Sequence, residues 1–239
     1  MKDSDASRAL KEARSFVKAR EYSSALEKYI WFHNHALEYD PAMSGVRLSY
    51  AIAEWVELGE DYRPARVALE AIRDEKSRQL ASGSQEIRLF LDVRAINVAL
   101  GQENRTHELF AHIAEQNREF AQKCFPAAIE SLVNAKEFLM ARSFMPSPDE
   151  QLDRFAAPLK SRIGRPDRKD DRFGLSFHET LARIYANKVK EILQILVAVG
   201  DEDEAKRVHR AAIDCFDDEK IRICVAELLA PGSPSKLVN

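Results

Sequence analysis

Apolar residues recur along almost the whole chain at steps of three and four positions. The step is clearest in three segments, whose apolar positions are Leu10, Ala13, Phe16 and Val17, then Leu48, Ile52, Trp55 and Val56, and then Leu89, Val93, Ile96 and Leu100. This spacing places the apolar side chains on one face of an α-helix. No segment alternates convincingly with the period of two that is typical of a β-strand. The pattern predicts an all-α fold.

Helix-breaking residues separate these segments. They are Asp40-Pro41, Gly59, Ser82-Gly83, Gly101, Pro146 to Pro148, Gly164, Gly174, Gly200 and Pro231-Gly232. Between them the pattern predicts helices near residues 5–19, 22–39, 45–58, 62–80, 85–100, 104–117, 126–135, 138–145, 149–163, 175–199, 202–216 and 218–229. Because the connections are short, consecutive helices are expected to pair as antiparallel hairpins.

One stretch, residues 21–41 (EYSSALEKYIWFHNHALEYDP), has a distinctive order of residues. The aromatic Tyr22 opens the helix and Ala25 follows three residues later. A second small residue, Ala36, comes further along, and Pro41 closes the unit. This order resembles the second helix and exit turn of a tetratricopeptide (TPR) repeat. It departs from that pattern by about one extra helical turn, essentially IWFH, in its middle.

Other segments carry the same order less completely. Small and aromatic residues stand at comparable places in Ala13 and Phe16, in Ala53, Gly59, Tyr62 and Ala65, in Ala95 and Gly101, in Phe138 and Ala141, and in Gly200, Ala205 and Ala212. Small side chains let two helices cross closely, and an aromatic fills the wedge between them. The spacing departs from the family's repeat of about 34 residues, since Ala25 and Ala65 lie 40 positions apart and Ala141 and Ala205 lie 64 apart.

The TPR resemblance implies stacked antiparallel hairpins in a right-handed superhelix. We expect TPR-like repeats in residues 1–146, an interrupting helix and charged loop in 147–174, and a C-terminal hairpin with a final helix in 175–239, in one continuous array. It also implies a non-catalytic scaffold or adaptor that binds a peptide or helix of a partner protein on the concave surface formed by the first helices.

Candidate partner-binding residues on that concave surface are Arg14, Arg47, Tyr50 and Glu54, followed further along by Asn187, Lys190 and Gln194. TPR proteins that hold chaperone C-termini use Lys and Asn on successive inner helices to bind a carboxylate. Here the corresponding places carry Leu10, Arg14, Tyr50 and Glu54. The sequence therefore favours a groove of mixed charge over a receptor for chaperone tails.

Trp31 is the fifth candidate contact. On a helix through residues 25–39, Tyr29, Phe32, His33 and Tyr39 fall on a broad apolar arc, whereas Trp31 falls in the middle of the polar half. A tryptophan there either anchors a partner or is covered by another part of the chain. Self-association is the simplest form of partner contact, so a homo-oligomeric regulatory module is the alternative interpretation.

The amino-acid composition argues against several classes of function. The 239 residues are 45% hydrophobic and 31% charged, with a net charge of -3, which provides no overall field for nucleic acid or an anionic membrane. The N-terminus lacks the apolar segment of a secretory signal, and the most apolar run, residues 192–199, is too short to span a bilayer. Three widely spaced cysteines favour free thiols. We expect a cytoplasmic protein.

Local catalytic or metal-binding motifs are missing. There is no glycine-rich phosphate loop and no GxSxG elbow, and adjacent acids such as Asp170 and Asp171 are typical of solvated or capping positions. His33 and His35 are two residues apart, so they point to opposite sides of a helix and cannot share a metal ion. We expect no enzyme activity, cofactor or metal. An enzyme whose site is assembled only by folding stays the third interpretation.

One segment, Lys160 to Arg172 (KSRIGRPDRKDDR), is dense in charge and contains two helix breakers. It is interpreted as a flexible connection between hairpins, or as a docking element for an acidic or phosphate-bearing partner.

Overall fold

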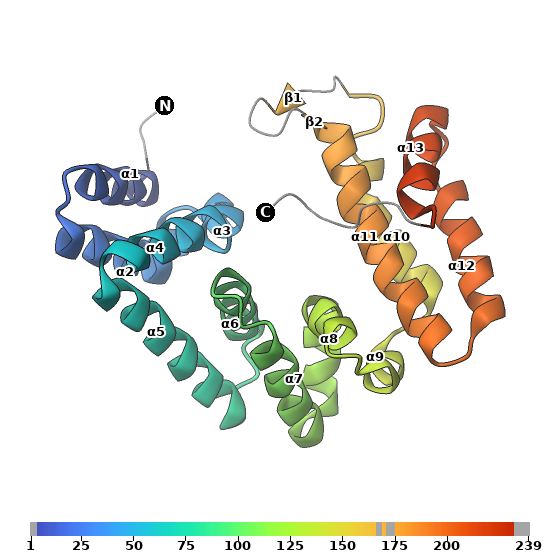
Figure 1. Cartoon of the computed structure of the whole chain (residues 1–239), viewed down its shortest axis with the longest axis horizontal. Helices are drawn as coiled ribbons and strands as arrows, with labels where there is room; N and C mark the ends of the chain where they lie inside the picture. Colours follow the sequence, from blue (N-terminus) through green and yellow to red (C-terminus); the bar gives the residue numbers. More distant parts are fainter. Residues whose placement is uncertain (1–3, 166–168, 171–174, 232–239) are drawn as a thin grey trace. The chain divides into compact units, whose positions relative to one another are not determined.

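The computed structural model describes residues 4–165, 169–170 and 175–231, which are helical along almost all of their length (Figure 1). The chain divides into two compact units, Met1–Ser131 and Leu132–Asn239. The prediction of an all-α fold is confirmed.

The first unit begins with a hairpin and continues through further helices in sequence order. Its elements are α1 (Asp5–Lys18), α2 (Tyr22–Tyr39), the 3-10 turn η1 (Pro41–Met43), α3 (Ser44–Arg47), α4 (Tyr50–Asp61), α5 (Arg63–Ala81), α6 (Ile87–Ala99), α7 (Asn104–Gln116) and most of α8 (Arg118–Asn134). α1 packs along α2, α4 along α5, and α5 along α6. These contacts join helices that are neighbours in the sequence, as expected for stacked hairpins.

The second unit is built around one long helix. Its elements are α9 (Phe138–Phe144), α10 (Pro148–Lys160), the two-residue strands β1 (Lys169–Asp170) and β2 (Leu175–Ser176), α11 (Phe177–Ala198), α12 (Glu202–Asp214) and α13 (Glu219–Leu229). The strands pair antiparallel, Lys169 with Ser176 and Asp170 with Leu175. α11 contacts α9, α10, α12 and α13. Figure 1 shows α10, α11, α12 and α13 lying side by side.

The division between the units falls earlier than the sequence predicts. The expected boundaries were residues 146 and 174, but the structure divides between Ser131 and Leu132. The reason is packing: α9 and α10 both contact α11, so they belong to the unit that α11 organises. The charged segment Lys160 to Arg172 lies partly outside the described residues, and its proposed docking role is not tested.

Two of the predicted helices differ clearly from the observed ones. The helix expected near 45–58 is interrupted, with α3 ending at Arg47 and α4 running from Tyr50 to Asp61. Gly59 therefore lies inside α4. A Cβ there would lie 3.0 Å from the Cβ of Arg66 on α5, so glycine permits a close helix crossing. The helix expected to begin at Pro126 begins at Arg118, with the proline inside it.

Several helices end in the same way. The backbone turns to positive φ at Arg20, Gly83, Gly101, Lys136 and Gly200. In each case the next amide donates to the carbonyl five residues earlier, at 2.8–3.0 Å. This is the Schellman motif, in which a left-handed residue ends one helix and satisfies its last carbonyls. Three-residue links of this kind join α1 to α2, α8 to α9 and α11 to α12.

The core of the first unit combines small residues at crossings with large aromatics. Ala13, Ala25 and Ala65 are fully buried, and the rings of Tyr22 and Tyr62 lie 6.0 Å apart. These are positions on which the repeat resemblance depends. In α2, Tyr29, Phe32 and His33 are buried, as predicted, whereas Tyr39, at the end of the predicted apolar arc, is 53% exposed.

In the second unit, α11 buries one full face. Ser176 caps its first turn in a capping box with Glu179, and this defines where the helix begins. Tyr185 lies at the centre, where its hydroxyl donates to the Ala212 carbonyl at 2.9 Å and its ring meets Phe216 edge-on at 5.1 Å. No helix in the described part of the chain is long and apolar enough to cross a membrane.

Candidate interaction surfaces

The structure brings two of the predicted partner-binding residues together. The Arg14 guanidinium on α1 donates to both carboxylate oxygens of Glu54 on α4, at 2.7 and 2.9 Å. The Tyr29 hydroxyl donates to the same carboxylate at 3.4 Å. Arg14 and Glu54 therefore neutralise one another. Tyr50 is 45% exposed on the same helix as Glu54.

Arg47 is not on an exposed face. Its side chain is buried, and its guanidinium donates to the Asp92 carboxylate and, at 3.1 Å, to the His33 backbone carbonyl. Lys76 also donates to Asp92. The prediction that Arg47 lies on an exposed face is wrong, because its guanidinium pairs with the buried carboxylate of Asp92 on α6.

These residues form a buried polar cluster of His33, Arg47, Lys76 and Asp92, contributed by α2, α3, α5 and α6. Burial and the charge of Lys76 lower the pKa of His33 to about 3. The imidazole is therefore neutral, with its Nε2 accepting from Lys76 Nζ at 3.1 Å. Burial alone would raise the pKa of Asp92, but hydrogen bonds and charge from Arg47 and Lys76 lower it. A cluster of this kind holds four helices in one arrangement.

The sequence contains a signal for this cluster. Asp92 stands beside Val93 within the apolar stripe that runs from Leu89 to Ile96. A carboxylate on a buried helix face requires a cationic partner, because an unpaired buried charge is costly. The sequence does not say which cation reaches it. The partners, Arg47 and Lys76, come from two other helices.

Trp31 lies on the outward half of α2 but is half-buried. Its ring lies 5.5 Å from the ring of His35 and 5.4 Å from that of Tyr39. The three residues are spaced i, i+4, i+8, so they form a stripe along one side of the helix. We call Trp31, His35 and Tyr39 the aromatic stripe. His33 is buried on the other side, as the two-residue spacing predicts.

An exposed apolar surface in the second unit lies on α11. Val197 is 56% exposed and Leu193, one turn earlier, is half-buried. We call these two residues the α11 ridge. Both line two separate open grooves, one on each side of the ridge.

The first groove, of about 600 Å³, lies between the α11 ridge and the α8–α9 link. Opposite the ridge it is lined by Val133, Lys136 and Phe138. The second, of about 620 Å³, lies between the ridge and α12, where it is lined by Ala205, His209 and Ile213, with Glu202, Lys206 and Arg210. We call them the α9 groove and the α12 groove.

Cations outnumber carboxylates in the lining of these grooves. Lys136, Lys206 and Arg210 are exposed there, against one carboxylate, Glu202. Lys206 also pairs with Asp203 at 3.3 Å, but both side chains are largely exposed, so the pair is weak. The lining is thus cationic in a chain whose net charge is -3.

The sequence holds a signal for the ridge too. The run from Ile192 to Val199 (ILQILVAV) has apolar residues around nearly the whole helix, more than one buried face requires. Ile192, Ile195 and Leu196 are buried, which leaves Leu193 and Val197 on the open side. Gln194, predicted on the sequence to face a ligand, is exposed in the α9 groove.

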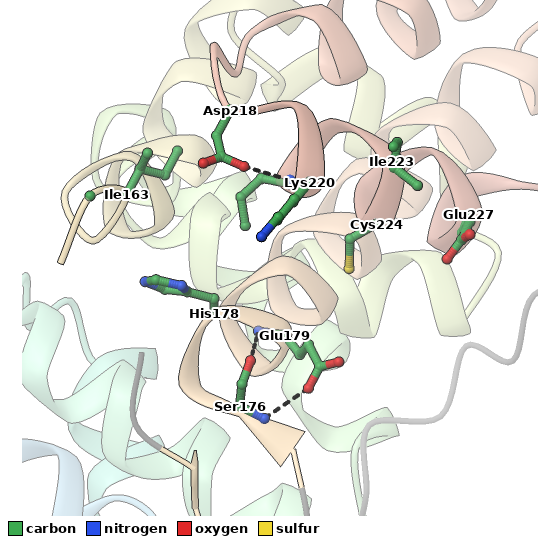
Figure 2. Close-up of a pocket in the computed structure, with 11 residues that line it drawn as sticks. Ile163, Ser176, His178, Glu179, Asp218, Lys220, Ile223, Cys224 and Glu227 are labelled. Atoms are coloured by element: carbon green, nitrogen blue, oxygen red, sulfur yellow. Dashed lines mark hydrogen bonds between the residues drawn. The ribbon is translucent and has the colours of Figure 1, made fainter. Parts of the chain in front are cut away.

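A third pocket, of about 680 Å³, lies where the N-terminal ends of α11 and α13 meet (Figure 2). Its lining includes Ile163, His178, Glu179, Asp218, Lys220 and Cys224. Figure 2 shows Lys220 on α13 pointing towards the space above His178 on α11, and Cys224 on α13 pointing towards Glu179. Titratable groups distant in the sequence therefore do converge at one place.

Several of the polar groups in this third pocket already have structural roles. The Glu179 carboxylate accepts from the Ser176 amide at 2.8 Å, and the Asp218 carboxylate from the Ile221 amide at 3.0 Å, so both cap helices. The His178 ring donates from Nε2 to the Arg162 carbonyl at 3.0 Å. Burial, followed by the charges of nearby glutamates, raises the pKa of Cys224. This disfavours the nucleophilic thiolate.

Cys124, Cys215 and Cys224 are free thiols, of which Cys124 is buried and the other two are half-buried. Among the described residues, no group of three His, Cys, Asp or Glu side chains is placed to hold a metal ion. No protein-family model, curated protein or solved structure matches this chain.

Proposed function

We propose that this chain is a non-catalytic protein-interaction module of TPR-like type, a scaffold or adaptor that binds a segment of a partner protein. The binding surface is formed by the α11 ridge and the two grooves beside it. The Arg14 and Glu54 side chains, predicted to make such contacts, are engaged with one another at 2.7 Å. We therefore place binding on the second unit.

One observation carries the proposal: the exposed apolar ridge between two open grooves. Val197 is 56% exposed, and isolated exposed apolar residues are ordinary on protein surfaces. Here, however, Val197 and Leu193 line both grooves, so a partner can bury side chains on both sides of the ridge. Concave surfaces with an apolar floor and a polar rim are typical of peptide- and helix-binding sites.

The third pocket supports a non-catalytic role over the enzyme interpretation. A catalytic acid, base or nucleophile must be available to the substrate. The Glu179 and Asp218 carboxylates cap helices instead. The raised pKa of Cys224 keeps its sulfur protonated.

A matched pair of variants tests the proposal. Val197→Asp places a charge on the ridge, whereas Ile184→Asp makes the same change on α11 at a position 43% exposed that lines neither groove. The measurement is affinity capture from the native host followed by mass spectrometry. We expect proteins captured by the unaltered chain and by Ile184→Asp to be lost with Val197→Asp, by tenfold or more. Identical capture by all three would contradict the proposal. Circular dichroism confirms that each variant is folded.

A further inference from the structure

We infer that the segment bound by the α9 and α12 grooves is an acidic amphipathic α-helix of a partner protein. This inference rests on the proposed function and specifies the chemistry of the partner.

The shape of the surface favours a helix. Every element that lines the two grooves is a helix or a link between helices, so the surface offers no unpaired strand edge to which an extended peptide could add. Leu193 and Val197 stand one turn apart, a rise of about 6 Å. A second helix packs across such a ridge by placing side chains three or four residues apart into the grooves on either side.

The positions of the apolar residues on the bound helix follow from the same geometry. Phe138 and Val133 lie opposite the ridge in the α9 groove, and Ala205 and Ile213 lie opposite it in the α12 groove. Apolar side chains at i, i+3, i+4 and i+7 of a helix form a stripe wide enough to reach both.

The charge at the groove edges determines which sign of charge is favoured on the bound helix, at the positions that flank its apolar stripe. Lys136 stands at the edge of the α9 groove, and Lys206 and Arg210 at that of the α12 groove. Glu202 is the opposing carboxylate in the lining. Carboxylates on the flanks of the bound helix complement this pattern, whereas lysines meet like charge. Because these side chains are exposed, the preference falls as salt rises.

The test uses a displayed library of 16-residue helical peptides selected on the full chain. Each peptide carries Leu, Ile, Val, Met or Phe at the i, i+3, i+4 and i+7 positions, and Glu or Lys at each flanking position. We expect Glu to be enriched at least tenfold over Lys. A proline in the middle of a selected peptide should abolish its binding, because proline breaks the helix.

Variants of the chain then locate the charges. Lys206→Glu combined with Arg210→Glu should weaken a selected peptide about tenfold at low salt. Lys123→Glu combined with Arg154→Glu changes the net charge equally at exposed positions outside both grooves. This control should bind as the unaltered chain does. Fluorescence anisotropy gives the dissociation constants.

The outcomes separate this inference from the proposed function. If the selected peptides lose binding to Val197→Asp but show no preference for Glu, the inference of an acidic partner is wrong. The proposed binding surface would still be supported. If selected peptides still bind with a central proline, the inference that the bound segment is helical is wrong. If no peptide distinguishes the unaltered chain from Val197→Asp, the inference fails, and the capture experiment with Val197→Asp and Ile184→Asp decides the proposed function separately.

Discussion

At the scale of single residues, the buried polar cluster is the most constrained feature of the first unit. Asp92 is 1% exposed and accepts from two cations, Arg47 and Lys76. Removing one partner of a buried ion pair leaves an uncompensated charge, and this costs about 3–5 kcal/mol. Arg47 therefore serves the stability of the fold rather than recognition of a partner.

His33 makes stability depend on pH. Its pKa is about 3 in the folded chain, against about 6.5 when unfolded. As pH falls below 6.5, His33 takes up a proton in the unfolded chain but stays neutral in the folded chain. The free energy of unfolding therefore falls. Between pH 7 and pH 5 this loss is about 2 kcal/mol. His33→Gln keeps an acceptor for Lys76 and should flatten that pH dependence. Urea unfolding at the two pH values measures it.

The control for this prediction is His35→Gln. His35 lies on the same helix with 45% of its side chain exposed and is not part of the buried polar cluster, so the loss of stability below pH 7 should persist in this variant. Equal pH dependence in the unaltered chain and His33→Gln would show that the imidazole is not buried in a neutral form.

At the scale of elements, the feature that recurs is the short link between two helices, with one residue in the left-handed conformation. The left-handed position is glycine at Gly101 but arginine at Arg20. A side chain in the left-handed region costs about 1 kcal/mol, so glycine is favoured there. The same turn is thus formed at Arg20 by a residue that disfavours the left-handed conformation, and at Gly101 by a residue that favours it.

Opposite substitutions at the two links should have opposite effects. Gly101→Ala should lower the free energy of unfolding by about 1 kcal/mol, and Arg20→Gly should raise it by about 0.5–1 kcal/mol. A Cβ at Gly101 would meet no atom within 4 Å, so the loss there reflects backbone strain alone. Thermal and urea unfolding measure both. A loss of stability in Arg20→Gly would mean that the arginine side chain contributes more than its backbone conformation costs.

The α11 helix carries apolar residues on its buried face and also on its open side. Its buried face carries Tyr185 and Ile192, and its open side carries Val197. Apolar residues on both sides are necessary for a helix that packs against its own unit and also binds a partner.

At the scale of the whole molecule, the open question is whether copies of the chain associate. The aromatic stripe on α2 is the structural basis for the homo-oligomer alternative, with Tyr39 53% exposed and Trp31 half-buried beside it. Aromatic residues that are partly exposed are common anchors of protein interfaces.

Trp31→Ala tests that alternative. If the stripe joins two copies, the substitution should lower the mass measured by light scattering at micromolar concentration. Val67→Ala, at a residue 53% exposed on α5, is the control and should leave the mass unchanged. A mass unaffected by Trp31→Ala would exclude the stripe as the contact between copies.

Much of the fold was predictable from sequence because helices are local structures. The predicted ends of the second helix, residues 22 and 39, match Tyr22–Tyr39, and the segment predicted near 202–216 is observed as Glu202–Asp214. Periodicity and turn residues act over a few positions, so they can be read directly from the chain. The boundary at Pro126 failed because packing tolerates a proline inside α8.

The candidate sites were less predictable, because contacts between helices decide them. The sequence by itself determined the all-α class, the hairpin links and the buried face of α2, since each depends on neighbouring residues. Only the tertiary structure decided that Arg47 turns inward to Asp92, that Arg14 is matched by Glu54, and that Val197 lies open between two grooves. Each of these depends on which distant helix packs alongside, and helical periodicity does not encode that choice.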